Sequence, residues 1–157
     1  MIVRKAIPQD RDAITAILNE VIAIGGSTAY EEPLEPAYFD RFIAPEDSRT
    51  FLHVAEADGV VVGFQWMNPD ETGMGIIATF AQPGTAQRGI GSALFKQTLR
   101  CCLEAGYTLL DATIRADNSG GLAYYSKMGF EDHSVTRAVP LNDGTPVDRV
   151  HKRMHLG

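Results

Sequence analysis

The sequence predicts an α/β fold in which about four helices cover a central, mixed and twisted β-sheet of about seven strands. Three observations favour this class. An amphipathic helix follows a short first strand, an antiparallel meander occupies the middle of the chain, and helices then alternate with strands, giving the order βααβββαβαββ. The length of 157 residues, of which 45% are hydrophobic, predicts one domain over residues 1–157 with one compact core.

The first half of the chain begins with a strand, IVRKAI, and an amphipathic helix. The apolar residues of this helix recur at the spacing of one helical face: Ile14, Ile17, Leu18, Val21 and Ile22. Asp10 precedes the helix and is expected to cap it, since a carboxylate accepts hydrogen bonds from the free N–H groups of a first turn. The Gly- and Pro-rich residues 24–36 then form a loop, and residues 37–43 form a short second helix.

The middle of the chain predicts an antiparallel meander. Two apolar runs flank Asp58 and Gly59, a dipeptide that accepts the positive φ angles of a tight turn, and residues 74–81 add a third strand. The remaining elements are a helix from about residue 89 to 105, a buried strand at 107–114, a short helix at 118–128 and two strands around the turn LNDG at 141–144.

Composition and charge exclude several classes of function. Fourteen basic and twenty acidic side chains give a net charge of −6 without any basic run, which argues against a nucleic-acid partner. No apolar run reaches the ~18 residues of a membrane span, and the N-terminus lacks a signal-type apolar core, so we expect a cytoplasmic protein with no membrane partner. Cys101 and Cys102 are adjacent in a helix, match no metal spacing and are expected to be reduced packing residues.

The segment QPGTAQRGIGSALF, residues 82–95, places glycines directly before a helix. Such a turn presents free backbone N–H groups and the positive end of a helix dipole, which suit a phosphate. The segment is not a P-loop, because the Gly-Lys-Ser/Thr ending is missing. Its spacing also fails the dinucleotide fingerprint, and Asp111, near the acidic position of that fingerprint, is interpreted as a polar-face residue of a strand. A purely structural turn is the alternative.

Two motifs in this chain resemble the GNAT acetyltransferase superfamily. The first resembles the family's phosphate motif and comprises Ala81, Gln82 and Pro83 followed by Ala86, Gln87, Arg88, Gly89, Ile90, Gly91 and Ser92. The second comprises Asn118, Tyr125, Lys127, Gly129 and Phe130. The chain departs from the family at Ala86, where Gln or Arg is usual, and at Gln87, where many members carry Gly. The resemblance covers nearly the whole chain and implies the GNAT acyl-CoA acyltransferase fold.

The resemblance further implies an enzyme that moves the acetyl group of acetyl-CoA directly to a primary amine, with no acyl-enzyme and no metal. The implied contacts with acetyl-CoA come from a splayed strand and the two motifs: Thr79, Phe80, Ala81, Ala86, Gln87, Arg88, Gly89, Ile90, Gly91, Ser92, Asn118 and Tyr125. Tyr125 is the implied general acid, since a phenol can donate to the leaving thiolate. The alternatives are a packing role for Tyr125, a helix cap for Asn118, and solvated charges for Lys127 and Arg88.

The acceptor side of the site rests on a shorter match. The loop STAYEEPLEP resembles that of phosphinothricin acetyltransferase-like members, which implies a small amino-acid-like amine bound by Thr28, Tyr30, Glu31 and Glu32. Covering the sheet edge is the other role open to this loop. The strand at 74–81 contains no carboxylate for a general base, so the candidate bases are Glu31, Glu32, Glu71 and His133.

Other functions remain open on the sequence. They are a non-catalytic acyl-CoA-binding or sensing domain, transfer of a longer acyl chain, and acetylation of a peptide or polyamine amine. The resemblance is also compatible with a homodimer.

Overall fold

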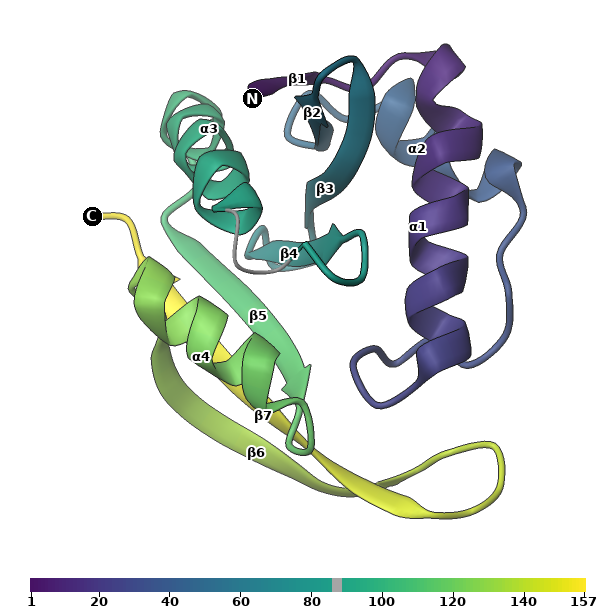
Figure 1. Cartoon of the computed structure of the whole chain (residues 1–157). Helices are drawn as coiled ribbons and strands as arrows, with labels where there is room; N and C mark the ends of the chain where they lie inside the picture. The colour runs from purple at the N-terminus through teal and green to yellow at the C-terminus, as the bar shows by residue number, and fades with distance from the viewer. Residues whose placement is uncertain (86–88) are drawn as a thin grey trace.

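A computed structural model describes residues 1–85 and 89–157 and contains a seven-stranded mixed sheet in the order β1-β2-β3-β4-β5-β7-β6. Helices α1 and α2 lie on one face, and α3 and α4 lie on the other (Figure 1). The predicted fold class and element order are confirmed. The elements are β1 (Ile2–Lys5), the 3₁₀ turn η1 (Pro8–Asp10), α1 (Arg11–Ile24), the 3₁₀ turn η2 (Pro36–Phe39), α2 (Asp40–Ile43), β2 (Phe51–Ala57), β3 (Val60–Pro69), β4 (Gly75–Ala81), α3 (Ile90–Glu104), β5 (Leu109–Arg115), α4 (Ser119–Met128), β6 (Glu131–Pro140) and β7 (Pro146–His155).

The sheet consists of two antiparallel groups joined by one parallel pair. Strands β1 to β4 form the predicted meander, and β5, β7 and β6 form the second group. The turn between β2 and β3 is the predicted one, with φ of 51° at Asp58 and 78° at Gly59. Strands β4 and β5 are parallel, and helix α3 connects them.

The sheet separates two hydrophobic clusters. On one face, α1 and α2 pack over aromatic side chains of the sheet, and Phe42 stacks on Trp66 with ring centroids 4.5 Å apart. On the other face, α3 and α4 pack through residues such as Phe95 and Phe130. Because successive strand residues point to opposite faces, each strand supplies side chains to both clusters. The same alternation distributes the polar residues of the site between the two faces.

Asp10 does not cap α1 as predicted. Its carboxylate turns back to accept hydrogen bonds from the Arg4 guanidinium at 2.8 and 2.9 Å and from the backbone N–H of Ile7 at 2.8 Å. A buried carboxylate gains more from a guanidinium partner than from a neutral N–H group, so the ion pair is preferred. Arg4 accordingly holds the pKa of Asp10 below its usual range.

Strands β4 and β5 diverge almost as soon as they meet. Within the described chain their hydrogen-bonded register covers two positions, Gly75 with Leu110 and Ile76 with Asp111. A Cβ atom at Gly75 would lie 2.7 Å from side-chain atoms of both Leu110 and Met67, so glycine is what allows the strands to approach here. Beyond Ile76, the edge of β4 that faces β5 has no strand partner.

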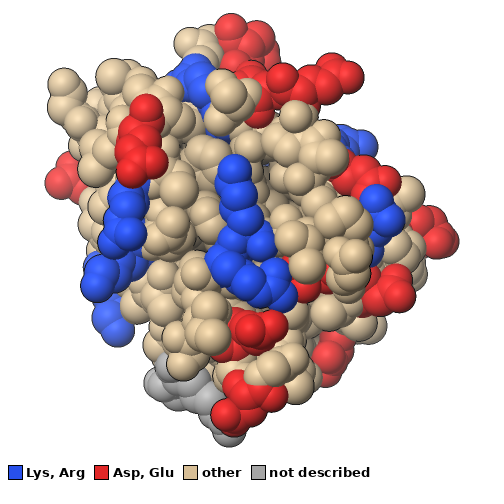
Figure 2. All heavy atoms as spheres, turned by 90° about the horizontal axis from the view of Figure 1, so that it is seen from above, with Lys and Arg blue, Asp and Glu red and all other residues tan. Residues whose placement is uncertain are grey.

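The surface carries charges of both signs. In the view of Figure 2, basic and acidic side chains lie close to one another over an otherwise uncharged surface. No helix within residues 1–85 and 89–157 is long and apolar enough to cross a membrane.

The buried hydroxyl of Thr98 gives a test of the packing under α3. Thr98 is 0% exposed, and its hydroxyl has no hydrogen-bond partner among the described residues. The variant Thr98→Val keeps the shape and removes the unpaired group, so it should raise the free energy of unfolding by about 1 kcal/mol, measured by urea titration. Thr98→Ser, which keeps the hydroxyl and loses a methyl group, is the control and should be destabilised. A Val variant less stable than the wild type contradicts this account.

Candidate active site

A cavity of about 1000 Å³ opens where β4 and β5 diverge. Its walls come from both faces of the sheet: the loop after α1, the η2–α2 segment, β3, β4, β5, β7 and the N-terminal halves of α3 and α4. This is where the fold exposes backbone and side-chain groups of seven separate segments to one space. It is the candidate active site.

The N-terminus of α3 forms one wall. Gly89 precedes the helix with φ of 73°, and Gly89, Gly91 and Ser92 all line the cavity. The predicted contacts Ala86, Gln87 and Arg88 lie outside the described residues. A Cβ atom at Gly91 would lie 2.5 Å from the ring of Tyr124, so this glycine makes room for a neighbouring side chain. The first-turn N–H groups and the helix dipole make this end of α3 suitable for an anion.

The free edge of β4 forms a second wall. Thr79, Phe80 and Ala81, predicted to contact acetyl-CoA, all line the cavity. Ile90 was predicted to do the same, but its side chain is 3% exposed and packs with Ala55 instead. The contribution of Ile90 to this site is therefore limited to its backbone at the start of α3.

The two tyrosines of α4 line the cavity side by side, with ring centroids 4.9 Å apart. The hydroxyl groups of Tyr125 and Thr79 are 2.8 Å apart. Tyr124 donates a hydrogen bond to the backbone oxygen of Gly91 at 2.7 Å and lies 3.1 Å from the side-chain nitrogen of Gln65. Burial raises the pKa of Tyr124 to about 12, and that of Tyr125 further, against a smaller lowering by the Thr79 hydrogen bond. Both phenols are therefore protonated at neutral pH.

Asn118 lies at the start of α4 and also lines the cavity. Its side-chain oxygen accepts a hydrogen bond from the backbone N–H of Gly121 at 2.9 Å, which is the helix cap considered from the sequence. Its side-chain nitrogen donates to the backbone oxygen of Ser27 at 3.2 Å. Asn118 thus ties α4 to the loop after α1, and Lys127 of the same helix also lines the cavity.

The loop after α1 divides between the cavity and the opposite side of the loop. Thr28 and Tyr30 line the cavity as predicted. Glu31 and Glu32 do not belong to its lining: both Glu31 carboxylate oxygens accept from the backbone N–H of Asn142, at 2.9 and 3.1 Å, and Glu32 accepts from the Asn142 side chain. These carboxylates bind the β6–β7 turn to the loop, a long-range contact that the local sequence did not reveal.

Several lining residues were not identified from the sequence. The cations Arg41, Arg115 and Arg149 belong to the cavity wall, while none of its described lining residues is an acid or a histidine. The candidate bases Glu71 and His133 are exposed and lie outside this lining. The arginines come from α2, β5 and β7, so no sequence motif could have grouped them.

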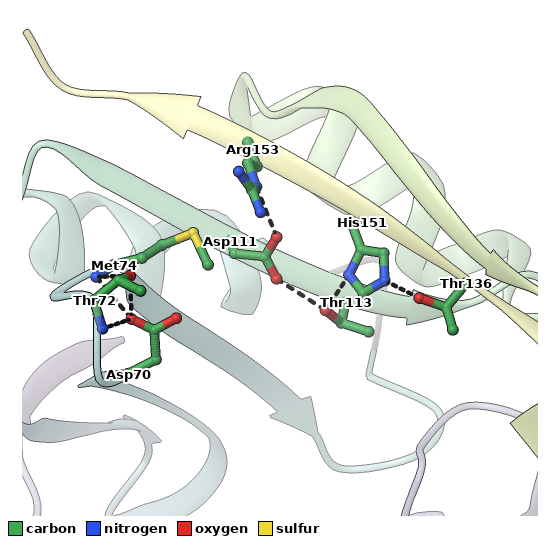
Figure 3. A network of polar contacts seen from close by, with 8 residues as sticks. All are labelled: Asp70, Thr72, Met74, Asp111, Thr113, Thr136, His151 and Arg153. Atoms are coloured by element: carbon green, nitrogen blue, oxygen red, sulfur yellow. Dashed lines mark hydrogen bonds and ion pairs between the residues drawn. The ribbon is translucent and has the colours of Figure 1, made fainter.

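A polar network lies on the face of β5 and β7 that points away from α3 and α4 (Figure 3). Thr113, which lines the cavity, donates to the carboxylate of Asp111 at 2.9 Å. Since its only proton is used there, Thr113 accepts at 2.9 Å from the Nδ1–H of His151, whose Nε2 contacts Thr136 at 2.6 Å. Asp111 is 3% exposed beneath Arg153, so it is a buried ion-pair partner as well as a polar-face residue. Elsewhere in Figure 3, Asp70 accepts from Thr72 and Met74.

The two cysteines have the packing role expected from the sequence. Cys102 is 0% exposed, and burial raises its pKa to about 12. Burial also raises the pKa of Cys101, whose sulfur lies 3.7 Å from the side-chain nitrogen of His53. Neither belongs to the cavity lining, and both are protonated thiols at neutral pH.

Comparison with known proteins places this geometry among acetyltransferases. A mycothiol acetyltransferase of Clavibacter sepedonicus is 34% identical over 89 residues, which make up 57% of this chain and 29% of that protein. The chain thus spans less than a third of that relative's length. YwnH of Bacillus subtilis, described as a candidate phosphinothricin acetyltransferase, is 28% identical over 156 residues, 94% of each protein.

Solved structures share the fold at low identity. A ribosomal-protein-alanine N-acetyltransferase of Brucella melitensis has a TM-score of 0.90 at 22% identity, over 99% of this chain and 100% of that one. A phosphinothricin acetyltransferase of Sinorhizobium meliloti, in complex with acetyl-CoA, has a TM-score of 0.88 at 22% identity, over 99% of this chain and 88% of that one. The profile of the acetyltransferase (GNAT) family matches residues 17–130, which include both the α3 entry turn and the segment from Asn118 to Tyr125. The chain therefore belongs to the GNAT acetyltransferase family.

Proposed function

We propose that this protein transfers the acetyl group of acetyl-CoA to the primary amine of a small, amino-acid-like molecule that also carries an anionic group. The observation that carries the proposal is the cavity at the divergence of β4 and β5. It joins a helix N-terminus, an unpaired strand edge and a protonated phenol, which are the groups that acyl transfer from a thioester needs. The names of the relatives, acetyltransferases of mycothiol and phosphinothricin, support the same class of reaction.

The α3 side of the cavity suits acetyl-CoA. The pyrophosphate lies at the N-terminus of α3, where first-turn N–H groups have no intrahelical partner and the dipole favours an anion. The pantetheine arm follows the free edge of β4, and backbone donors near Thr79 and Phe80 polarise the thioester carbonyl. Asn118 and Lys127 line the same cavity from α4.

The chemical step moves one proton to the departing sulfur. The amine attacks the thioester carbon, the C–S bond breaks, and the thiolate takes a proton from the Tyr125 phenol. Because burial raises the pKa of Tyr125, the phenol is protonated at neutral pH and can act as this acid. The amine must be neutral to attack, and we expect water in the cavity to accept its proton.

The charges at the acceptor end favour an anionic molecule. Arg115 is paired with Asp117 at 2.8 Å, and Arg41 lies 4.4 Å from the ring centroid of Tyr38. Arg149 forms no ion pair with any residue that the structure describes. An uncompensated guanidinium in a cavity wall binds a carboxylate or phosphinate through two parallel hydrogen bonds and repels a polyamine.

Binding of acetyl-CoA should stabilise the native protein. A ligand that binds only the native state adds ~2.7 kcal/mol at a hundredfold excess over its Kd, so saturating acetyl-CoA should raise the Tm in a thermal shift assay. Ser92→Asp should weaken acetyl-CoA binding by about tenfold or more, because it places a carboxylate at the anion site of α3, while the free protein keeps its Tm. Ser92→Asn is the matched neutral control. A Tm that is indifferent to acetyl-CoA rejects the proposed function.

Loss of the Tyr125 phenol should slow chemistry more than binding. Tyr125→Phe keeps the ring and removes the proton donor, so turnover should fall about a hundredfold while the Kd for acetyl-CoA changes only a few fold. Release of the CoA thiol during turnover measures the first quantity, and calorimetric titration measures the second. Tyr107→Phe is the control, because this buried tyrosine donates to the backbone of Arg49, away from the cavity. Equal turnover of the two variants shows that Tyr125 is only a packing residue.

Acceptor preference should follow charge. Amino acids and phosphinate or sulfone analogues should be acetylated faster than spermidine, aminoglycosides or peptide N-termini, as judged by initial rates at equal concentration. Arg149→Gln should raise the KM for the amino-acid acceptor about tenfold or more and leave the KM for acetyl-CoA unchanged. A tenfold preference for polyamines or peptides contradicts this acceptor class and leaves the acetyl-CoA assignment standing.

A further inference from the structure

A buried hydrogen-bond chain runs across the face of the sheet that carries α3 and α4. It connects Gly91, Tyr124, Gln65, Thr79 and Tyr125, and its four links are 2.7, 3.1, 2.8 and 2.8 Å long. Gln65 is 0% exposed on β3, opposite Thr79 of β4 in the sheet register. The chain therefore begins at the N-terminus of α3 and ends at the phenol assigned as general acid.

The direction of the first link is fixed by chemistry. The backbone oxygen of Gly91 can only accept, so the single hydroxyl proton of Tyr124 is donated to it. The oxygen of Tyr124 must then accept from Gln65. The Gln65 group that faces Tyr124 is accordingly the NH₂ group.

The reverse orientation of the Gln65 amide fits the contacts less well. With its oxygen turned toward Tyr124, the single proton of Tyr124 would face two acceptors, Gln65 and Gly91. The NH₂ group would then occupy the position of the present side-chain oxygen, which is buried and has no partner among the described residues. Burying two unpaired donors costs more than burying one unpaired acceptor oxygen. The orientation with NH₂ toward Tyr124 is favoured.

The second proton of this NH₂ group is donated to Thr79. With one lone pair of its hydroxyl oxygen occupied, Thr79 keeps its own proton for the neighbour 2.8 Å away, the hydroxyl oxygen of Tyr125. We propose that Gln65 and Thr79 are positioning residues that orient the Tyr125 phenol, so that its oxygen accepts from Thr79 and its proton points into the cavity toward the leaving sulfur. The inference rests on the proposed acetyl transfer and adds to it two residues that do not act on the substrate directly.

The same chain serves the proton transfer itself. When the C–S bond of acetyl-CoA breaks, the O–H bond of Tyr125 breaks and an S–H bond forms on CoA. The negative charge then rests on the phenolate oxygen, which already accepts the hydrogen bond from Thr79 and is stabilised by it. A proton equivalent to the one released by the attacking amine restores the phenol through water, so charge and protons balance over one turnover.

Thr79→Val tests the direction of the last link by the sign of two effects. If Thr79 donates to Tyr125, the variant loses this support, turnover falls about tenfold and the pKa of the thiol of bound CoA rises. If Tyr125 instead donates to Thr79, the variant frees the phenol proton, and turnover and thiol acidity both increase. Turnover is followed by CoA release, and the thiol pKa by the ultraviolet absorbance of the thiolate in the binary complex with CoA. Thr79→Ser keeps the hydroxyl and should restore both quantities.

Gln65→Leu tests whether the two residues act in series. It removes the donor that commits Thr79 to Tyr125, so turnover should fall severalfold, with little further loss when it is combined with Thr79→Val. Thr98→Val is the matched control, since it removes another fully buried threonine hydroxyl under α3 that makes no contact with this chain, and its turnover should equal that of the wild type.

The outcomes separate the two levels of the proposal. A wild-type protein that binds no CoA rejects acetyl transfer and this inference together. A wild-type protein that acetylates amines, with Thr79→Val equal to Thr98→Val in turnover and in bound-thiol pKa, overturns the positioning role alone. Losses in Gln65→Leu and Thr79→Val that simply multiply in the double variant overturn the serial arrangement.

Discussion

The divergence of β4 and β5 after two paired positions is the constraint on which the rest of the site depends. A parallel pair that stayed in register would satisfy the backbone groups of β4 beyond Ile76 and would close the sheet. Because the strands separate, these groups remain available, and the sheet contains an opening that reaches both of its faces. Gly75 limits the contact to one end by allowing Leu110 and Met67 to approach closely.

The two faces of the sheet contribute different chemistry to this opening. The α3–α4 face supplies a helix N-terminus and the buried chain from Gly91 to Tyr125, which suit a cofactor anion and a departing thiolate. The α1–α2 side supplies tyrosines, a tryptophan and three arginines, with no acid among the described lining residues. The net charge of −6 therefore says little about the ligand, since the charge around a binding site is set by the few groups that face it.

Patterns within a short stretch of sequence predicted the fold well, because they report local physics. The apolar face of α1, the positive φ angles at Asp58 and Gly59, and the Gly129 stop of α4 each depend on neighbours within a few residues. Asp10 was mispredicted for the opposite reason. Its partner Arg4 lies on β1, and an ion pair formed across the packed structure outcompeted the local helix cap.

The sequence by itself determined the family, the order of the elements and the two segments that form the cofactor side of the cavity, since these follow from periodicity, glycine placement and contiguous motifs. Only the tertiary structure decided which polar groups share the site. It turned Glu31 and Glu32 toward Asn142, brought Arg149 into the cavity wall, and aligned Gln65 and Thr79 with Tyr125. Those outcomes depend on strand register and side-chain alternation between segments distant in the chain, which no single stretch of residues encodes.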